Sequence, residues 1–222
     1  MAVALIVAAG RGERLGSGGP KALVTLAGKP MVEWSMRALR EVAEVQRIVV
    51  ALPPDRLGEA PAGTLAVAGG AARSQSVREA LAACGDGDPV IVHDAARPLA
   101  SPALFSQALA ELSRSGADAV VAAIPVSDTI KQVDEDGRMV ARTLDRSRLW
   151  AVHTPQVFRR AALERALLDA SDELLASATD DSWLIERAGG SVRIVRSGTQ
   201  NIKVTTSTDL QVAELLLAGQ GR

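Results

Sequence analysis

Residues 2–9 read Ala-Val-Ala-Leu-Ile-Val-Ala-Ala, and residues 10–21 continue with Gly-Arg-Gly-Glu-Arg-Leu-Gly-Ser-Gly-Gly-Pro-Lys. The apolar, β-branched run predicts a buried strand, and it lacks the basic start of a signal peptide. The glycine-rich loop lets backbone N–H groups approach phosphate oxygens, and Arg14 and Lys21 can neutralise phosphate charge. Because ligands of open α/β sheets bind at the carboxyl ends of the strands, we interpret this loop as a polyphosphate cradle.

Two better-known phosphate loops do not fit this stretch. It lacks the Gly-Lys-Ser/Thr ending of a P-loop, and the spacing of Gly10, Gly12 and Gly16 misses the dinucleotide pattern by one residue. A merely flexible loop remains the alternative interpretation on glycine content alone.

The composition suits one large α/β domain that spans residues 1–222. Of the 222 residues 47% are hydrophobic, and the formal net charge of -1 provides no overall field to attract nucleic acid. The first apolar run is far shorter than the roughly 20 residues of a membrane helix, and no other stretch comes closer. From the charge and the absence of a membrane-length run, we expect no nucleic-acid or membrane partner. Cys84 is the single cysteine, so we expect a reducing cytoplasm.

Short apolar runs alternate with helical patterns, which is typical of parallel strands joined by crossover helices. Strands are predicted near Ala4–Ala8, Arg47–Leu52, Leu65–Ala68, Val90–His93, Ala119–Ile124, Ala151–Phe158 and Val192–Val195. Helices are predicted near Met31–Val42, Ser74–Ala83, Pro102–Ser115, Arg160–Ala170, Asp180–Ala188 and Thr208–Leu217. The sequence therefore predicts an α/β fold with a mostly parallel, twisted sheet flanked by helices.

Residues 127–150 break this alternation. Two alternating runs, Thr129–Val133 and Met139–Thr143, flank an acidic turn that ends at Gly137, a pattern that predicts a β-hairpin. Because an isolated hairpin is marginally stable in water, we expect a protruding arm that packs on a second copy of the chain. A flap that folds on its own domain is the alternative.

A second candidate site follows the buried strand near residue 90, where residues 93–98 read His-Asp-Ala-Ala-Arg-Pro. The carboxylate of Asp94 could hold Mg²⁺ that bridges phosphates, since this ion prefers oxygen ligands. The alternative role for Asp94 is to cap the turn that follows. We expect His93 to be a packed strand residue rather than a base or a ligand. Two histidines and one cysteine make a zinc site an unsuitable interpretation.

Basic and hydroxyl residues recur in the last hundred residues of the chain. Taken singly, each is ordinary for a solvated surface or a strand. They are Thr129, Lys131, Arg146, Arg148, Thr154 and Lys203.

Several of these segments, in this order, resemble the 2-C-methyl-D-erythritol 4-phosphate cytidylyltransferases of the bacterial and plastid isoprenoid pathway. The resemblance spans nearly the whole chain, and the segments around Asp94 and Lys203 are its most specific parts. The matching segments are Ala8–Arg14, Pro20-Lys21, Gly69-Gly70, Arg73–Val77, His93–Pro98, Asp128-Thr129, Asp145-Arg146, Leu149-Trp150, Thr154–Gln156, Thr179–Asp181 and Asn201–Thr205.

The resemblance implies a Rossmann-like α/β fold, a homodimer with exchanged arms, and a cytidylyltransferase reaction. With Mg²⁺ or another divalent cation, CMP would pass from CTP to 2-C-methyl-D-erythritol 4-phosphate, giving 4-diphosphocytidyl-2-C-methyl-D-erythritol and pyrophosphate. The acceptor phosphate is already a dianionic nucleophile near neutral pH, so it needs no dedicated base. The protein mainly has to align two anions and offset their repulsion.

The resemblance also implies roles for individual residues. The implied catalytic residues are Arg14 and Lys21, which match those that stabilise the pentacoordinate α-phosphate, and Arg146 and Lys203, which match those that position the acceptor. The implied nucleotide contacts are Ala8, Ala9, Gly10, Gly70, Ser76 and Asp94. The implied acceptor contacts are Asp94, Arg97, Thr129, Arg146, Thr154 and Lys203. Asp94 is also the expected metal ligand, placed for metal or acceptor and not for a core ion pair.

Two positions depart from the family pattern. Ala22 stands where many relatives carry glutamine, and Ala71 stands where an acidic residue is frequent, which removes one expected ribose or base contact. Two other functions stay open at this point. A ribitol 5-phosphate cytidylyltransferase shares the same loops and differs in the acceptor pocket. A catalytically inactive nucleotide-binding module would be expected to lose Arg14, Lys21 or Asp94, and all three are present.

Overall fold

The computed structural model describes residues 1–10, 12, 15 and 19–220. In this part of the chain a seven-stranded sheet has the order β11-β7-β10-β6-β1-β4-β5. The strands are β1 (Ala2–Val7), β4 (Val45–Leu52), β5 (Leu65–Ala68), β6 (Val90–Asp94), β7 (Ala119–Pro125), β10 (Trp150–Phe158) and β11 (Val192–Arg196). All pairs except those of β10 are parallel, so the predicted mostly parallel α/β sheet is confirmed.

Helices cover both faces of the sheet, because its strands are apolar on both sides. The helices are α1 (Met31–Arg40), α2 (Arg73–Ala83), α3 (Pro102–Ser115), α4 (Arg160–Leu168), α5 (Asp172–Ser177), α6 (Asp181–Arg187) and α7 (Ser207–Gln220). Along β1, Ala4 and Ile6 contact the core under α1 and α3, whereas Val3 and Leu5 contact the core under α2, α4, α5 and α6. None of the helices in the described residues is long and apolar enough to cross a membrane.

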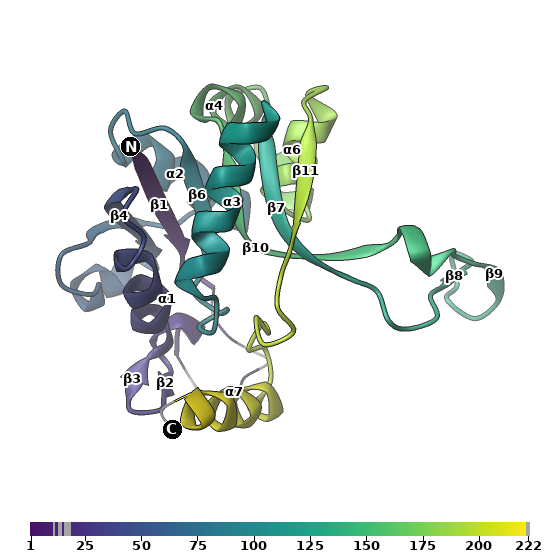
Figure 1. Cartoon of the computed structure of the whole chain (residues 1–222), viewed down its shortest axis with the longest axis horizontal. Helices are drawn as coiled ribbons and strands as arrows, with labels where there is room; N and C mark the ends of the chain where they lie inside the picture. The colour runs from purple at the N-terminus through teal and green to yellow at the C-terminus, as the bar shows by residue number, and fades with distance from the viewer. Residues whose placement is uncertain (11, 13–14, 16–18, 221–222) are drawn as a thin grey trace.

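The predicted hairpin is present as a long extension between β7 and β10 (Figure 1). Its strands β8 (Lys131–Val133) and β9 (Val140–Thr143) pair with each other, outside the main sheet. At the tip, the Oδ1 atom of Asp134 accepts hydrogen bonds from the backbone of Arg138 and Met139. Because the chain leaves along β7 and returns along β10 with no crossover helix, β10 has to run antiparallel to β7.

Several short elements escaped the sequence prediction. They are α5, the small hairpin of β2 (Thr25–Leu26) and β3 (Lys29–Pro30), and the 3₁₀ turns η2 (Lys21–Leu23), η3 (Pro54–Glu59) and η4 (Arg146–Arg148). The predicted strands and the longer predicted helices are all present, with bounds that differ by a few residues, as is usual for element ends.

The start of α3 offers a test of the local sequence signals. The Oγ atom of Ser101 accepts a hydrogen bond from the backbone of Leu104 at 3.3 Å, and Pro102 follows at the first helical position. Ser101→Ala should lower the free energy of unfolding by about 1 kcal/mol, because it removes this cap. Ser113→Ala, at an exposed position of the same helix, should leave the stability unchanged or slightly raised. Urea unfolding of both variants measures the difference, and equal stabilities would contradict the capping role.

Candidate functional site

The site lies where the direction of the sheet's connections reverses. From β1 the chain passes to β4 and β5 on one side, and then returns to β6 on the other side of β1. In open α/β sheets, ligands bind at the carboxyl ends of the strands at such a switch point. Val7 pairs with Asp94 at the ends of β1 and β6, and the backbone N–H of Ala95 donates to the carbonyl of Val7 at 3.1 Å.

A pocket of about 220 Å³ opens at this point. Most residues predicted for the nucleotide and for catalysis line it, together with the two positions that depart from the family pattern. The lining residues are Val7, Ala8, Ala9, Gly10, Lys21, Ala22, Gly70, Ala71, Ala72, Arg73, Ser76, Asp94, Ala95, Ala96 and Lys203. The structure thus brings together segments that are distant in the sequence.

The glycine-rich loop is closed by backbone contacts. The backbone N–H of Lys21 donates to the carbonyl of Gly10 at 3.2 Å, so both ends of the loop meet at the pocket. Gly12 has a φ of 71°, and a Cβ atom there would lie 2.8 Å from the Cβ of Lys21. A side chain at position 12 would therefore displace Lys21. Arg14, the other predicted catalytic cation of the loop, lies outside the described residues.

The second wall of the pocket is the turn before α2. The Oγ atom of Ser76 accepts a hydrogen bond from the backbone of Gly70 at 3.1 Å and donates to the carbonyl of Ala72 at 3.1 Å. A Cβ on Gly70 would lie 2.4 Å from the Cβ of Gln75, so only glycine fits this turn. Ser76 thus shapes the pocket wall through its hydroxyl group.

The floor of the pocket carries a string of alternating charges. Asp94 Oδ2 lies 2.8 Å from Lys203 Nζ, and Asp94 Oδ1 lies 2.9 Å from Arg73 Nε. The Nη1 atom of Arg73 also forms an ion pair with Asp181, which is fully buried at the start of α6. The expectation that Asp94 takes no part in a buried ion pair was therefore wrong.

The physical reason is the position of Asp94 at the end of a central strand. It is 7% exposed, and a buried carboxylate needs cations to remain charged. Although burial alone would raise the pKa of Asp94, the charges of Arg73 and Lys203 hold it far below its usual range. Burial would likewise lower the pKa of Arg73, but Asp181 and Asp94 together raise it.

Behind the floor lies a buried hydrogen-bonded layer that includes His93, Arg97, Thr154 and Asn201. The hydroxyl of Thr154 accepts from the backbone N–H of Asp94 at 3.1 Å and lies 3.0 Å from His93 Nδ1. Because His93 Nε2 lies 3.2 Å from the carbonyl of Arg97, Nε2 carries the proton and Nδ1 accepts from Thr154. His93 also packs edge-on against Phe105, so its predicted role as a packed strand residue is confirmed.

Arg97 and Thr154 lie behind the pocket and support the segment that carries Lys203. Arg97 Nη1 donates to the carbonyl of Asn201 at 2.8 Å, and Asn201 Nδ2 donates to the carbonyl of Thr154 at 2.9 Å. The backbone of Val204 donates to the carbonyl of Ala96 at 2.8 Å. These bonds fix Lys203 opposite Asp94. The acceptor contacts predicted for Arg97 and Thr154 stay predictions.

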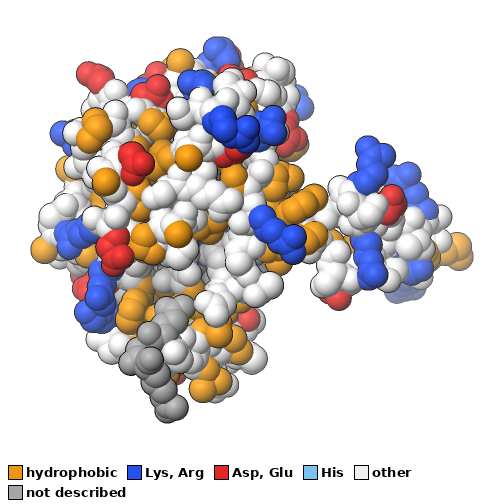
Figure 2. All heavy atoms as spheres, viewed as in Figure 1, with side chains coloured by type: hydrophobic (Ala, Val, Ile, Leu, Met, Phe, Trp, Pro, Cys, Tyr) orange, Lys and Arg blue, Asp and Glu red, His pale blue; other side chains and the backbone are white. Residues whose placement is uncertain are grey.

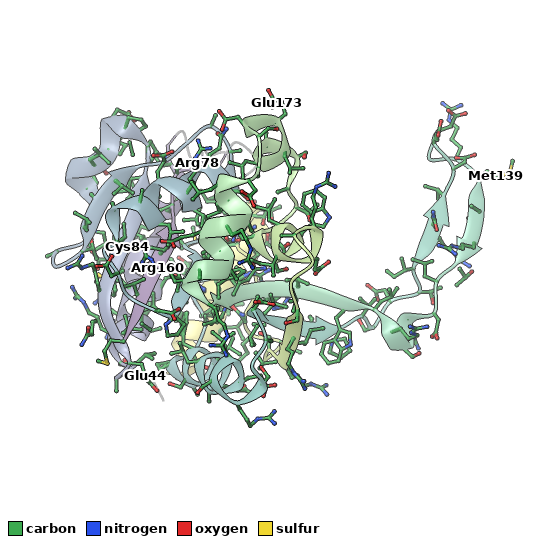
Figure 3. The ribbon with its side chains drawn as sticks, turned by 90° about the horizontal axis from the view of Figure 1, so that it is seen from above. Glu44, Arg78, Cys84, Met139, Arg160 and Glu173 are labelled. Carbon is green, nitrogen blue, oxygen red and sulfur yellow. The ribbon has the colours of Figure 1, made fainter. Side chains whose placement is uncertain are left out.

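The two predicted residues of the arm lie apart from the pocket of their own chain. Thr129 is exposed, and the exposed Arg146 donates to the carbonyl of Ser127 on the opposite limb of the arm. Seen from above, the arm extends well away from the body, with Met139 at its far end (Figure 3). A single chain therefore does not bring Thr129 and Arg146 to Lys21 and Lys203.

Comparisons with known proteins agree with this geometry. The family model described as 2-C-methyl-D-erythritol 4-phosphate cytidylyltransferase matches residues 2–219. The chain belongs to this family. A curated member from Saccharopolyspora erythraea is 45% identical over 97% of this chain and 99% of its own length. One from Rubrobacter xylanophilus is 41% identical over 100% of this chain and 96% of its own length.

Solved structures show the same fold. The cytidylyltransferase of the family from Thermus thermophilus is 33% identical, with a TM-score of 0.81 over 97% of this chain and 98% of that chain. The 4-diphosphocytidyl-2C-methyl-D-erythritol synthase from Anaerococcus prevotii is 28% identical, with a TM-score of 0.83 over 98% of each chain. The family assignment and the Rossmann-like fold predicted from the sequence are confirmed.

Sequence reasoning did not assign site roles to Arg73, Asp181 or Asn201, although all three lie in segments that resemble the cytidylyltransferase family. One signal was available for Arg73, which begins α2 with no acidic residue in its first turn. A cation is unfavourable at a helix N-terminus, so it needs carboxylates from elsewhere in the fold.

A divalent cation would find limited protein ligands here. Among the described residues, no group of three or more His, Cys, Asp or Glu side chains could hold a metal. Asp94 offers a carboxylate, but each of its oxygens already faces a cation. This set suits an ion such as Mg²⁺ that takes one or two carboxylates and receives its other ligands from substrate phosphates and water.

Protonation of His93 tests the buried layer. Burial lowers the pKa of His93 from 6.5 to about 4. Neutral His93 therefore adds stability above pH 6.5, and this contribution is lost as the pH falls toward 4. Side-chain NMR of His153→Gln, which leaves a single histidine, should show the Nε2–H tautomer and a midpoint near 4. A midpoint at or above 6.5 would contradict the layer.

Proposed function

We propose that this chain transfers CMP from CTP to 2-C-methyl-D-erythritol 4-phosphate, giving 4-diphosphocytidyl-2-C-methyl-D-erythritol and pyrophosphate. The main support is the pocket at the ends of β1 and β6, which gathers Lys21, Arg73 and Lys203 beside glycine-rich backbone. Three cations in one pocket, two of them paired with Asp94, suit two phosphorylated substrates. They also give local positive charge to a chain whose net charge is -1.

In the proposed reaction, the backbone of Ala8–Gly10 and the turn at Gly70 hold the nucleotide, while Lys203 orients the acceptor phosphate. An oxygen of that phosphate attacks the α-phosphorus of CTP, and the bond to the β-phosphate breaks as pyrophosphate leaves. Lys21 and Arg14 stabilise the charge that develops on the α-phosphate. Asp94 would hold a bound Mg²⁺, which supplies further neutralisation of phosphate charge.

No side chain has to remove a proton, since the acceptor phosphate is already ionised near neutral pH. This agrees with the placement of His93, which is fully buried and holds Thr154 instead of facing the pocket. Catalysis then depends on alignment of the two anions and on stabilisation of the transition state. The cytoplasm remains the proposed compartment, on the argument from the single cysteine.

The acceptor is proposed from the family. The curated relatives are named as the methylerythritol enzyme, and the chain matches them over nearly their whole length. Pyrophosphate release should be measured with CTP, ATP, GTP and UTP, each with 2-C-methyl-D-erythritol 4-phosphate and with ribitol 5-phosphate. We expect CTP with the methylerythritol phosphate to exceed every other pair in kcat/KM by at least about 10²-fold, as in sites that recognise a substrate by hydrogen bonds. Faster turnover of ribitol 5-phosphate would instead assign the alternative function.

We also propose that the protein is a homodimer in which the arms are exchanged. All residues of β8 and β9 are exposed, including Val133 (44%) and Val140 (54%), and so is Met139 (70%) just before β9. The space-filling view shows the arm as a separate lobe with basic side chains on its surface (Figure 2). A two-stranded hairpin without a core is marginal alone, and a partner's body would supply the missing surface.

In this assembly Arg146 serves the pocket of the partner subunit. Lys21→Ala and Arg146→Ala homodimers should each lose at least about 10²-fold in kcat, because each lacks one stabilising cation. After subunit exchange in an equal mixture, about half of the dimers are mixed, and each contains one intact site under two-fold symmetry. Activity should therefore recover to about a quarter of the wild-type value.

The mixture needs two controls. Exchange should be verified with differently tagged subunits. In the second control, a mixture of Lys21→Ala with Lys29→Ala, only the sites that keep Lys21 should be active, since Lys29 does not line the pocket. A verified mixed dimer of the first pair that stays inactive would show that Arg146 acts in its own chain, because every site would then carry one lesion.

A further inference from the structure

Arg73 joins three segments of the fold at the floor of the pocket. Its Nε atom binds Asp94 at the end of β6, and its Nη1 atom binds Asp181 at the start of α6. Arg73 itself is the first residue of α2. The guanidinium group can do this because its N–H groups point in different fixed directions, whereas a lysine ammonium is a single point of charge.

The helix dipole and burial both disfavour a positive charge at the position of Arg73. Its charge lies at the positive end of the α2 dipole, and only 24% of its side chain is exposed. Buried ion pairs often add little net stability compared with well-packed apolar residues. Since exceptions to local rules tend to occur at functional sites, the reason for this arginine should be sought in the pocket that it lines.

The consequence falls on Lys203. Asp94 offers one oxygen to Arg73 and the other to Lys203, so the two cations share one negative charge. The side chain of Lys203 is 46% exposed, whereas that of Asp94 is 10% exposed. Lys203 is thus held at the pocket by the carboxylate of Asp94, whose charge Arg73 already largely neutralises.

We propose that Arg73 is a positioning residue that shares Asp94 with Lys203 and so leaves the Lys203 ammonium available to the acceptor phosphate. This inference rests on the proposed function, in which Lys203 orients that phosphate. Asp181 anchors the guanidinium group and balances the string, which contains two cations and two carboxylates.

Loss of Arg73 would change the pocket in two ways. Asp94 would hold Lys203 more strongly, so the acceptor phosphate would have to compete with a carboxylate for the same ammonium. If Lys203 turned to the phosphate, Asp94 would be left without a cation and would repel that phosphate. Both effects raise the KM for the acceptor, and both act less on CTP, whose proposed cations Lys21 and Arg14 lie in the glycine-rich loop.

The test replaces both members of the buried pair, because Arg73→Gln alone would leave Asp181 buried and unpaired. In Arg73→Gln/Asp181→Asn, kcat/KM for 2-C-methyl-D-erythritol 4-phosphate should fall by about 10–100-fold, the usual effect of losing a group that orients a site residue. The fall should come mainly from KM for the acceptor, with KM for CTP changed less than about threefold. The single variant Arg73→Lys should give a KM for the acceptor between those of the wild type and the double variant, since lysine keeps the positive charge but cannot bind two carboxylates in fixed directions.

Arg78→Gln/Asp172→Asn is the matched control. Arg78 also lies on α2 and binds Asp172 at 2.9 Å at the start of α5, but this pair is on the surface. The control should keep both KM values and kcat. Thermal unfolding of every variant separates a change in the folded fraction from a change in kinetics per folded molecule.

The outcomes separate the two levels of inference. If the wild type and the control release no pyrophosphate from CTP with the acceptor, the proposed function fails. If they are active and Arg73→Gln/Asp181→Asn keeps the wild-type KM for the acceptor, Arg73 is a purely structural residue and this inference is overturned. An increase confined to the KM for CTP would also overturn it, because Arg73 would then serve the nucleotide.

Discussion

The parallel register between β1 and β6 is the constraint on which the site depends. It pairs Val7 with Asp94, so the glycine-rich loop and the aspartate leave the sheet side by side. Side chains alternate between the two faces of a strand, and a shift by one residue would move Asp94 to the opposite face and His93 to its place. The apolar neighbours of Asp94 in β6 are buried against helices on both faces, and their packing fixes this register.

Electrostatics at the site follow from burial. The sheet places a carboxylate at the edge of the core, where it can remain charged only between cations. Lys203 supplies one of them from a segment held by Asn201, and Arg73 supplies the other from the start of a helix. A chain with almost no net charge can thereby maintain a local cluster of cations for anionic ligands.

The sequence predicted the fold well because strand and helix periodicities are local. The bounds of β5 and α3 agreed residue for residue, and the hairpin between Asp134 and Met139 was recognised from its turn. The antiparallel direction of β10 was missed, since direction depends on the connection and not on the apolar pattern of the strand. The short α5 was missed because it is too brief to show a helical period.

The site was predicted less completely than the fold. Residues of the loops after β1 and β6 were found from their composition and position. The partners of Asp94 were not, because Arg73 lies 21 positions before it and Asp181 lies 108 positions after Arg73. Such long-range contacts have no spacing that a single sequence can reveal. For the same reason, the sequence did not reveal that Arg97 and Thr154, both predicted to contact the acceptor, also take part in buried hydrogen bonds.

The body and the arm differ in a way that bears on how the proposed site would assemble. The proposed nucleotide side of the pocket is built on buried strands, so it forms when the domain folds. Thr129 and Arg146 lie on an exposed extension that has no core of its own. If the arm docks on a partner as proposed, its ordering and the completion of the acceptor side become one event, and the free energy of association contributes to both. Acceptor binding would then depend on protein concentration at high dilution, whereas CTP binding to the body would not.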